Sequence, residues 1–394
     1  MSPPAVPALL PAGLMDVLPP WAAFEAATVE RLVATFTAFG YERIKPPLVE
    51  FAETLLEGSG VSLTTEAFRW MDPISQRMLA LRPDMTMQAA RIAASRLPSA
   101  PRPLRLSYAG QVTRVRGSQL RPERQLGQVG GEIFGVDAIE ADVEVIVMAI
   151  TALAGAGVDP ISVDLGLPTL VPAVLGGRTP NERTAARLRT ALDRKDITAV
   201  RDLAPTLGES TAQLLSQLVA CCGPAEIALP QLARLALPAA AGSALASLNA
   251  VHAGLTAAAP ALAITVDPIE NRGFEYHQGV TFALFSAGVS GELGRGGRYR
   301  TGSGEAATGV TLFMDAVMSA LAPPPPRPRL FLPHPADYTT ARGLREEGWT
   351  VVAGLTETAD PAAEAHRLGC THVYLAGDIR RTVVRQQLGP EQSP

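Results

Sequence analysis

The sequence predicts an α+β fold with helices packed against a sheet, followed by a short α/β module. Three observations lead to this prediction. Helical apolar spacing alternates with short strand-like runs in the first part of the chain. Residues 172–258 are rich in Ala, Leu and Arg and read as helix throughout, which indicates a helical insertion. Beyond a proline run, the order β-α-β-α-β favours a parallel module.

The composition is that of an ordinary globular protein. The chain has 394 residues, of which 47% are hydrophobic and 18% charged, with a formal net charge of −4. This length accommodates two or three domains with buried cores. A chain-wide nucleic-acid footprint would read basic, and this sequence does not.

Cysteines and apolar runs bear on the cellular location. Cys221 and Cys222 are adjacent and Cys370 lies far away, so we expect free thiols, as in a reducing cytoplasm. No Cys or His cluster has metal-ligand spacing, and we expect neither a metal nor a cofactor. The N-terminus lacks a charged leader before an apolar run, and the Ala-rich stretches are too interrupted to span a membrane. We therefore predict a cytoplasmic protein.

The first helix is predicted over residues 21–39. Its apolar residues, Phe24, Val29, Leu32, Val33 and Phe36, recur at helical spacing, and Gly40 ends it. A second clear helix is predicted over residues 140–153, because acidic residues occupy its first turns. Residues 85–95 also read as helix. The predicted strands of this part are 41–45, 78–81, 105–108 and 132–135.

The remaining elements follow the helical insertion. Strands are predicted over residues 262–267, 279–285 and 308–312. A Pro-rich linker over 323–328 then separates a main domain, 1–322, from a module at 329–394 with a polar, disordered tail. In that module the predicted strands are 329–333, 349–353 and 371–375, and the predicted helices are 336–347 and 362–368.

Three segments carry the chemical information, and each has a purely structural alternative. In Leu81 to Gln88, Asp84 and Thr86 could contact a small ligand or simply cap a helix. Between Tyr108 and Gln128, a cluster of arginines indicates an anion site or a solvated basic hairpin. The third segment, residues 271–282 with the Gly-rich 294–299, allows close backbone approach or a plain hairpin. None of the three has the glycine placement of a dinucleotide fingerprint or a P-loop.

In this order, the three segments closely resemble histidyl-tRNA synthetase, a class II aminoacyl-tRNA synthetase. Residues 11–19 and 39–50 also resemble that family's start and its dimer-forming motif 1, while 108–135 matches motif 2 without a gap. The resemblance covers residues 8–320. It implies an antiparallel sheet flanked by helices, a dimer, and a C-terminal module similar to a truncated anticodon-binding domain.

The resemblance also implies a pocket for histidine. Its expected residues are Asp84, Thr86, Arg114, Gln128, Glu132, Arg272, Tyr276 and His277. Carboxylate, hydroxyl and amide groups suit an α-ammonium, the two arginines suit a carboxylate or phosphate, and Glu132 can accept a hydrogen bond from an imidazole N–H. At His277 the family usually has a second tyrosine, which alters the recognition of the imidazole.

The positions that hold ATP in the family have changed. Motif 2 normally reads Arg-x-Glu, but here it reads Arg114-Val115-Arg116. In motif 3, Phe313 stands where the family has Gly, and Ala316 where it has Arg. Two lost charge interactions, at about 3 kcal/mol each, predict a loss of roughly 10⁴-fold in activation of an amino acid.

A retained amino-acid pocket without its nucleotide site resembles the regulatory-subunit family of ATP phosphoribosyltransferase. That resemblance implies a non-catalytic protein in histidine biosynthesis, without catalytic residues of its own. It would assemble with the short-form catalytic subunit as a hetero-oligomer, be required for its activity, and mediate allosteric feedback inhibition by L-histidine. The short C-terminal module implies that it does not bind tRNA. The alternatives are an active histidyl-tRNA synthetase and a stand-alone histidine sensor or RNA-binding adaptor.

Overall fold

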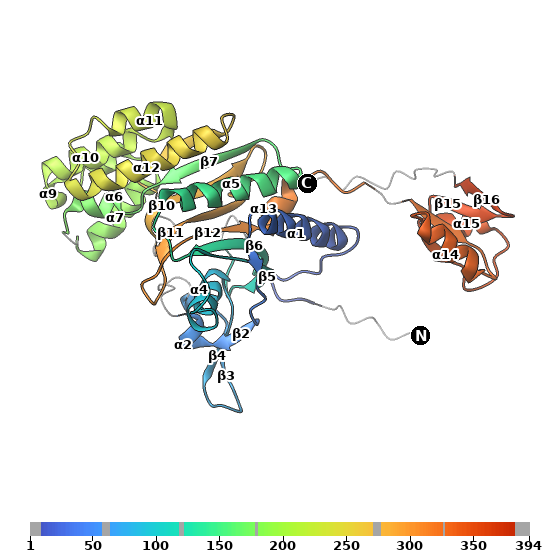
Figure 1. Cartoon of the computed structure of the whole chain (residues 1–394). Helices are drawn as coiled ribbons and strands as arrows, with labels where there is room; N and C mark the ends of the chain where they lie inside the picture. The colour runs from blue at the N-terminus through green and yellow to red at the C-terminus, as the bar shows by residue number, and fades with distance from the viewer. Residues whose placement is uncertain are drawn as a thin grey trace. The chain divides into compact units, whose positions relative to one another are not determined.

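A computed structural model describes residues 9–56, 64–117, 122–177, 180–270, 277–325 and 328–382. The chain divides into two compact units, Met1–Ala322 and Pro323–Pro394. The first unit contains a large, mostly antiparallel sheet with helices on both faces (Figure 1), so the predicted fold class is confirmed. No helix within the described ranges is long and apolar enough to cross a membrane.

The large sheet has nine strands in the order β1-β5-β6-β12-β11-β10-β7-β9-β8. The pairs β1–β5 and β7–β9 are parallel, and the other neighbours are antiparallel. The strands are β1 Glu42–Arg43, β5 Leu104–Thr113, β6 Gln125–Phe134, β7 Ile161–Gly166, β8 Gly223–Pro224, β9 Ala263–Asp267, β10 His277–Ser286, β11 Gly294–Arg300 and β12 Ala306–Phe313.

Alternation along the strands gives the sheet two different faces. On β6, Val129 and Ile133 face helices α1 (Trp21–Ala38) and α5 (Ile139–Ala156) and join the main apolar core. The alternate positions of β6, including Glu132 and Phe134, face the side that α4 (Thr86–Ser95) covers. We call this second side the site face. Figure 1 shows α1 and α5 on one side of β6 and α4 on the other.

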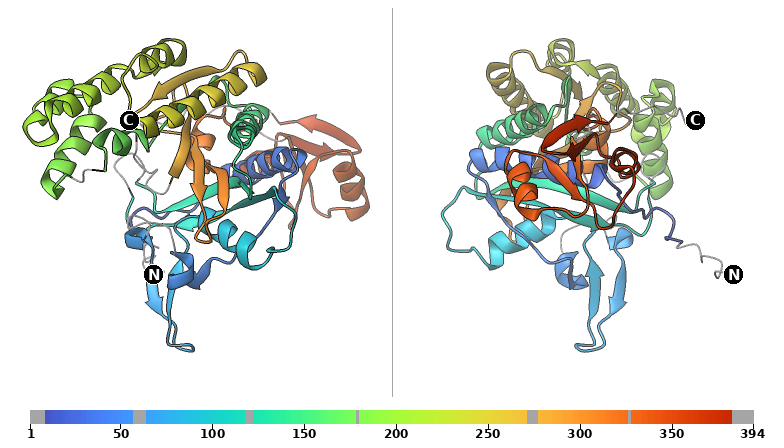
Figure 2. Two further views of the ribbon diagram at one scale, coloured as in Figure 1. Left: turned by 60° about the vertical axis from the view of Figure 1, so that its left-hand side comes forward. Right: turned by 90° about the vertical axis from the view of Figure 1, so that its right-hand side faces the viewer.

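The predicted insertion is helical, as expected, and packs at the β7–β9 end of the sheet (Figure 2). Leu215, Leu218 and Leu248 are fully buried and join the same core as α5. The helices are α6 Leu170–Leu175, α7 Glu182–Asp193, α8 Ile197–Arg201, α9 Ala204–Leu207, α10 Glu209–Ala220, α11 Ala225–Leu232 and α12 Ala239–Ala258. Helix α13, Met314–Ser319, follows β12.

A small three-stranded sheet projects below α4, as both figures show. It has the order β2-β4-β3, with β2 Val49–Phe51, β3 Arg69–Met71 and β4 Met78–Leu81, and α2 Ala52–Leu55 packs on it. The buried Arg82, directly after β4, donates to the carbonyls of Gln111 and Pro46 at 2.8 and 3.0 Å. These bonds tie the small sheet to β5, which places α4 over the site face.

The C-terminal unit has its own four-stranded sheet in the order β14-β13-β15-β16. Its elements are β13 Arg329–Leu332, α14 Tyr338–Glu346, β14 Thr350–Ala353, α15 Pro361–Arg367, β15 His372–Leu375 and β16 Asp378–Arg381. The first three strands are parallel, as the β-α-β-α-β order predicts, and β16 adds an antiparallel edge. The predicted tail, 386–394, and part of the predicted linker, 326–327, lie outside the described residues.

Several element predictions were wrong in extent or missing. The strands expected at 105–108 and 132–135 are the ten-residue β5 and β6. The Gly-rich 294–299, for which a plain hairpin was the alternative, is the central strand β11. Strands β2, β3, β7, β8 and β16 were not predicted. The three cysteines are free, as expected.

Candidate functional site

The site face is centred on Glu132, whose side chain is only 1% exposed. Tyr108 on β5 donates to Oε1 of Glu132 at 3.0 Å, and Tyr299 on β11 donates to Oε2 at 3.0 Å. The cross-strand register places Glu132 directly beside Gly309 on β12 and Leu106 on β5. A carboxyl group is therefore held by two phenols in the middle of a buried sheet.

The protonation of Glu132 is shifted by this setting. Burial raises the pKa of Glu132 from 4.5 to about 8, while the hydrogen bonds from Tyr299 and Tyr108 act in the opposite direction. Near neutral pH the carboxyl group therefore carries its proton for much of the time. In that form it can donate one hydrogen bond as well as accept others.

Glycines make the room for these side chains. A Cβ on Gly309 would lie 1.6 Å from Glu132 Oε2, and a Cβ on Gly130 would lie 2.3 Å from Tyr108 Cζ. Both distances are far below contact, so only glycine fits at these two positions. The close backbone approach predicted for the Gly-rich residues 294–299 is found at Gly296, where a Cβ would lie 2.1 Å from the carbonyl oxygen of Gly309. Gly309 and Gly130 lie outside the segment for which it was predicted.

A second group of polar side chains joins β6 to the start of α4. Gln128 donates from Nε2 to Asp84 Oδ2 at 3.0 Å and accepts from the Met85 amide at 3.2 Å. Asp84 also accepts from the Thr86 amide at 2.8 Å. The N-cap of α4 is Met85 and no side chain caps this helix, so neither Asp84 nor Thr86 is the helix cap that the alternative expected. The buried Gln128 and Thr86 lie on the same side of the sheet as Glu132.

A hydroxyl chain connects the two groups. Thr86 Oγ1 lies 3.1 Å from Tyr108 Oη, and Thr311 Oγ1 lies 3.0 Å from the same atom. In each of these two pairs, either hydroxyl can be the donor. Asp84, Thr86, Gln128 and Glu132, four of the eight predicted residues, are therefore brought into one hydrogen-bonded region.

The other predicted residues lie differently. His277, 7% exposed, begins β10, and its ring meets the Tyr299 ring edge-on at 6.2 Å between centroids. Arg114 lies just beyond the end of β5, where its Nε is 3.4 Å from Glu66 Oε2. Arg272 and Tyr276 lie outside the described residues.

The positions that hold ATP in the resembling family are occupied by side chains of another kind. Phe313 pairs in register with Gln128 and is 4% exposed, and Arg295 Cζ lies 5.8 Å from the centre of its ring. Ala316 is 5% exposed and belongs to the apolar core, whereas Arg116 is exposed. An aromatic ring and a methyl group thus stand at the two motif 3 positions.

Sequence reasoning missed Tyr108, Tyr299 and Thr311 as members of the site. All three lie within segments that the analysis singled out or predicted as strand. The available signal was the alternation of side chains between the two faces of a strand. Tyr108, Thr311 and Tyr299 all point to the same face of the sheet as Glu132.

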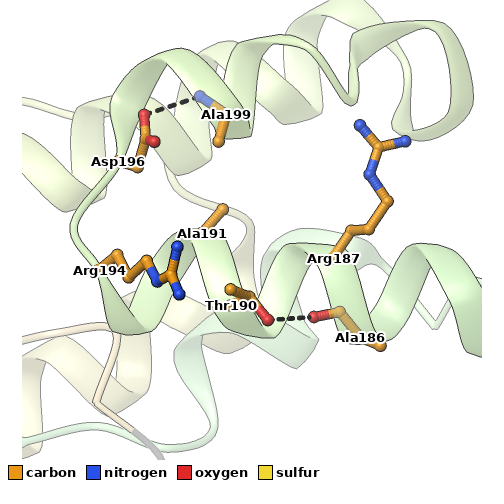
Figure 3. A pocket seen from close by; sticks show the side chains of 7 residues that line it. All are labelled: Ala186, Arg187, Thr190, Ala191, Arg194, Asp196 and Ala199. Atoms are coloured by element: carbon orange, nitrogen blue, oxygen red, sulfur yellow. Dashed lines mark hydrogen bonds between the residues drawn. The ribbon is translucent and has the colours of Figure 1, made fainter.

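A separate recess of about 340 Å³ lies on the helical insertion, between α7 and α8. Figure 3 shows Arg187 and Arg194 on either side of a floor of small residues, with Asp196 capping α8. All three side chains are exposed, so the recess differs from the buried Glu132 region. Within the part of the chain that the structure describes, no group of three His, Cys, Asp or Glu side chains could hold a metal ion.

Comparison with known proteins shows a consistent likeness. The family model for histidyl-tRNA synthetase matches residues 13–317. The ATP phosphoribosyltransferase regulatory subunit of Rhodospirillum centenum is 52% identical over 374 residues, 95% of this chain and 96% of that protein. The protein of the same name from Paramagnetospirillum magneticum is 54% identical over 365 residues, 93% of this chain and 95% of its own length.

Solved structures show the same likeness. A protein from Bacillus halodurans C, described as an ATP phosphoribosyltransferase regulatory subunit/histidyl-tRNA synthetase, has a TM-score of 0.80 and 27% identity. The match covers 93% of this chain and 97% of that one. Histidyl-tRNA synthetase from Nostoc has a TM-score of 0.76 at 16% identity, over 93% and 91% of the two chains, and shares the fold.

Proposed function

We propose a regulatory function from one premise: the chain belongs to the family of ATP phosphoribosyltransferase regulatory subunits, which share the histidyl-tRNA synthetase fold. The chain binds the short-form catalytic subunit in a hetero-oligomer and has no phosphoribosyl transfer activity of its own. It is required for activity of the catalytic subunit and mediates feedback inhibition by L-histidine in the first step of histidine biosynthesis.

One observation carries this proposal. The polar side chains around Glu132 are buried and hydrogen-bonded, whereas Phe313 and Ala316 stand where the resembling synthetases place nucleotide-binding residues. Phe313 places an aromatic ring beside Gln128, and Ala316 has no charge with which to steady a triphosphate. The site is therefore suited to bind an amino acid without activating it.

The pocket residues suggest how histidine is held. Asp84 and Gln128 lie together at the start of α4 and suit the α-ammonium group, to which Thr86 adds a hydroxyl. Glu132 lies between two phenols and suits an imidazole nitrogen. Arg114 and Arg272 are proposed for the carboxylate, and Tyr276 and His277 for the far wall of the pocket.

Regulation requires that histidine bind one arrangement of the complex better than another. An effector shifts an equilibrium only by its difference in affinity for the two arrangements, typically about 1–3 kcal/mol. A ligand held between the main sheet and α4 would supply this difference, because Gln128 and Glu132 lie on the sheet and Asp84 lies at the start of α4. We place the protein in the cytoplasm as a dimer, without tRNA binding.

Mixing the purified chain with the short-form catalytic subunit tests the proposal. Phosphoribosyl-ATP synthesis should be absent with this chain alone, weak or absent with the catalytic subunit alone, and strong with both. Histidine should then inhibit the mixture. Turnover of the catalytic subunit that stays unchanged on mixing would contradict the proposed function.

A further inference from the structure

Arg295 places a positive charge on the site face, and we propose that it binds the carboxylate of the amino acid held near Glu132. This inference rests on the proposed function, because it concerns the same pocket. It adds Arg295 to Arg114 and Arg272, which the family resemblance suggests for the carboxylate. It also adds a specificity that the proposed function leaves open, since a ligand without a carboxylate loses this contact.

The first observation is the face of the sheet to which Arg295 points. Side chains alternate between the two faces of a strand, so Arg295 and Tyr299, four residues apart on β11, share a face. Tyr299 donates to Glu132 Oε2 at 3.0 Å, which identifies that face as the site face. Arg298, in contrast, contacts Asp142 of α5 on the opposite face. Arg295 is therefore directed to the side where the amino acid is proposed to bind.

The second observation is the row of the sheet in which Arg295 lies. The register pairs Arg295 with Thr311 on β12, and Thr311 with Gly130 on β6. On β6, Gly130 lies two residues from Glu132 and two residues from Gln128, about 7 Å along the strand in each direction. The row of Arg295 thus lies between the two rows whose side chains are proposed to hold the two ends of the ligand.

The third observation is the direction of the guanidinium group. Arg295 Cζ lies 5.8 Å from the centre of the Phe313 ring, and Phe313 pairs in register with Gln128. The group is therefore directed toward the row of Gln128, which together with Asp84 is proposed to bind the α-ammonium group. The carboxylate of an α-amino acid is attached to the same carbon as its ammonium group, so it lies at this end of the ligand as well.

The Arg295 side chain is accessible, and its chemistry suits a carboxylate. It is 33% exposed, so a ligand can approach it. Its Nη2 forms an ion pair with Glu292, three residues earlier. A guanidinium group carries five N–H donors in a rigid fork, so it can bind two carboxylates at once. Glu292 thus orients the guanidinium group, which can bind the carboxylate of a ligand alongside it.

Calorimetric titration of the full-length chain with histidine and with histidinol tests the inference. Histidinol keeps the imidazole and the ammonium group but has a hydroxymethyl group in place of the carboxylate. Arg295→Met should weaken histidine binding about 10- to 100-fold, the effect of a hydrogen bond between charged groups, and should not weaken histidinol binding. Arg295→Lys should keep part of the affinity for histidine, because it retains the charge but loses the planar fork.

A matched control uses Arg300, which lies on the same strand but on the opposite face. Its side chain is 49% exposed and pairs with Asp137. Arg300→Met should bind both ligands as the wild type does. Displacement of bound histidine measures histidinol affinity where the direct signal is small. Should Arg295→Met fold poorly, Arg295→Gln provides a second removal of the charge.

Equal histidine affinity of the wild type and Arg295→Met would overturn the inference and leave the proposed function standing. An equal loss for histidine and histidinol would also overturn it, because Arg295 would then support the pocket as a whole. A third titration, with AMP, tests a phosphate as the partner instead. AMP binding that Arg295→Met abolishes, with histidine affinity unchanged, would assign the guanidinium group to a phosphate. A wild type that binds no histidine, alone or in the complex, would overturn both the inference and the proposed function.

Discussion

Glu132 is a buried carboxyl group in the middle of the large sheet. Its carboxyl group is fully buried, contacts two tyrosines, and has its pKa raised to about 8 by burial. The unfolded chain loses this proton near its ordinary pKa of 4.5, whereas the folded chain keeps it until about pH 8. Folding therefore binds a proton between these two values, and stability falls as pH rises through that window.

Glu132→Gln tests this linkage, because an amide is the neutral counterpart of the protonated acid. The wild type should lose stability between about pH 4.5 and about pH 8, by roughly 5 kcal/mol at most, since one pKa unit is worth about 1.36 kcal/mol. The variant should show a flatter profile over this range in urea unfolding. Gln in place of the exposed Glu140 is the control and should keep the wild-type slope. Identical profiles for the wild type and Glu132→Gln would disprove the shift.

Gly309 is the residue that lets Glu132 lie flat against β12. In Gly309→Ala the added Cβ would meet Glu132 Oε2 at 1.6 Å, so the carboxyl group must move. We expect a loss of about 1–3 kcal/mol in stability and at least tenfold weaker histidine binding. Calorimetry and urea unfolding provide the two values.

Gly155→Ala is the matched control for Gly309→Ala. Gly155 lies inside helix α5, and a Cβ there would have no atom within 4 Å. Alanine favours a helix interior over glycine by about 1 kcal/mol, so this variant should be slightly more stable and bind histidine normally. If Gly309→Ala behaves like Gly155→Ala, the close approach of Glu132 to β12 is wrong.

At the scale of elements, a buried ion pair fastens α5 to the sheet. Arg298 on β11 donates to Asp142 Oδ2 from Nη2 at 2.8 Å and from Nε at 3.2 Å, and Thr308 donates to Asp142 Oδ1 at 2.9 Å. The Asp142 side chain is 2% exposed. Burial raises the pKa of Asp142, while Arg298 lowers it. This pair holds the helix against the face opposite Glu132.

Arg298→Met should destabilise the main unit by about 3–5 kcal/mol, because it leaves a buried carboxylate without its counter-charge. Arg43→Met, which breaks an exposed pair with Glu30, should cost less than about 1 kcal/mol. Urea unfolding of both variants measures the difference. Equal costs would show that the Asp142 pair is not structurally important.

The sequence predicts some elements well because their local signals agree with the fold. The helix expected at 140–153 is the centre of α5, since apolar spacing and acidic first-turn residues both indicate helix. The strand β6 was recognised only at its end, because Gly127, Gly130 and Gly131 weaken any strand pattern. Those glycines make room for side chains from other strands and helices. Local strand propensity contains no information about such distant contacts.

The site was predictable only in part for a similar reason. Asp84, Thr86, Gln128 and Glu132 could be named because they lie in segments that resemble a known family. Tyr299 and Thr311 are brought to the Glu132 region by the pairing of strands that lie more than 160 residues apart in the chain. The local sequence does not determine how these strands are aligned with one another.

At the scale of the whole molecule, binding of the effector and activation of the partner should be separable. Glu132→Ala removes the proposed imidazole contact but leaves the surface of the chain unchanged, since Glu132 is 1% exposed. In the mixture with the catalytic subunit, this variant should still activate phosphoribosyl transfer, whereas inhibition by histidine should weaken at least tenfold. Steady-state rates against histidine concentration provide the measurement. Normal inhibition would exclude Glu132 from the effector site.

The central claim is that this chain keeps an amino-acid pocket but has lost the means to activate the amino acid. Phe313, Ala316 and Arg116 are the residues behind that claim. The most direct test is histidine-dependent exchange of pyrophosphate into ATP by the purified chain, with an active histidyl-tRNA synthetase measured alongside. The account predicts exchange at least 10⁴-fold below that enzyme, by the estimate of about 3 kcal/mol per lost group. Exchange at a comparable rate would contradict it.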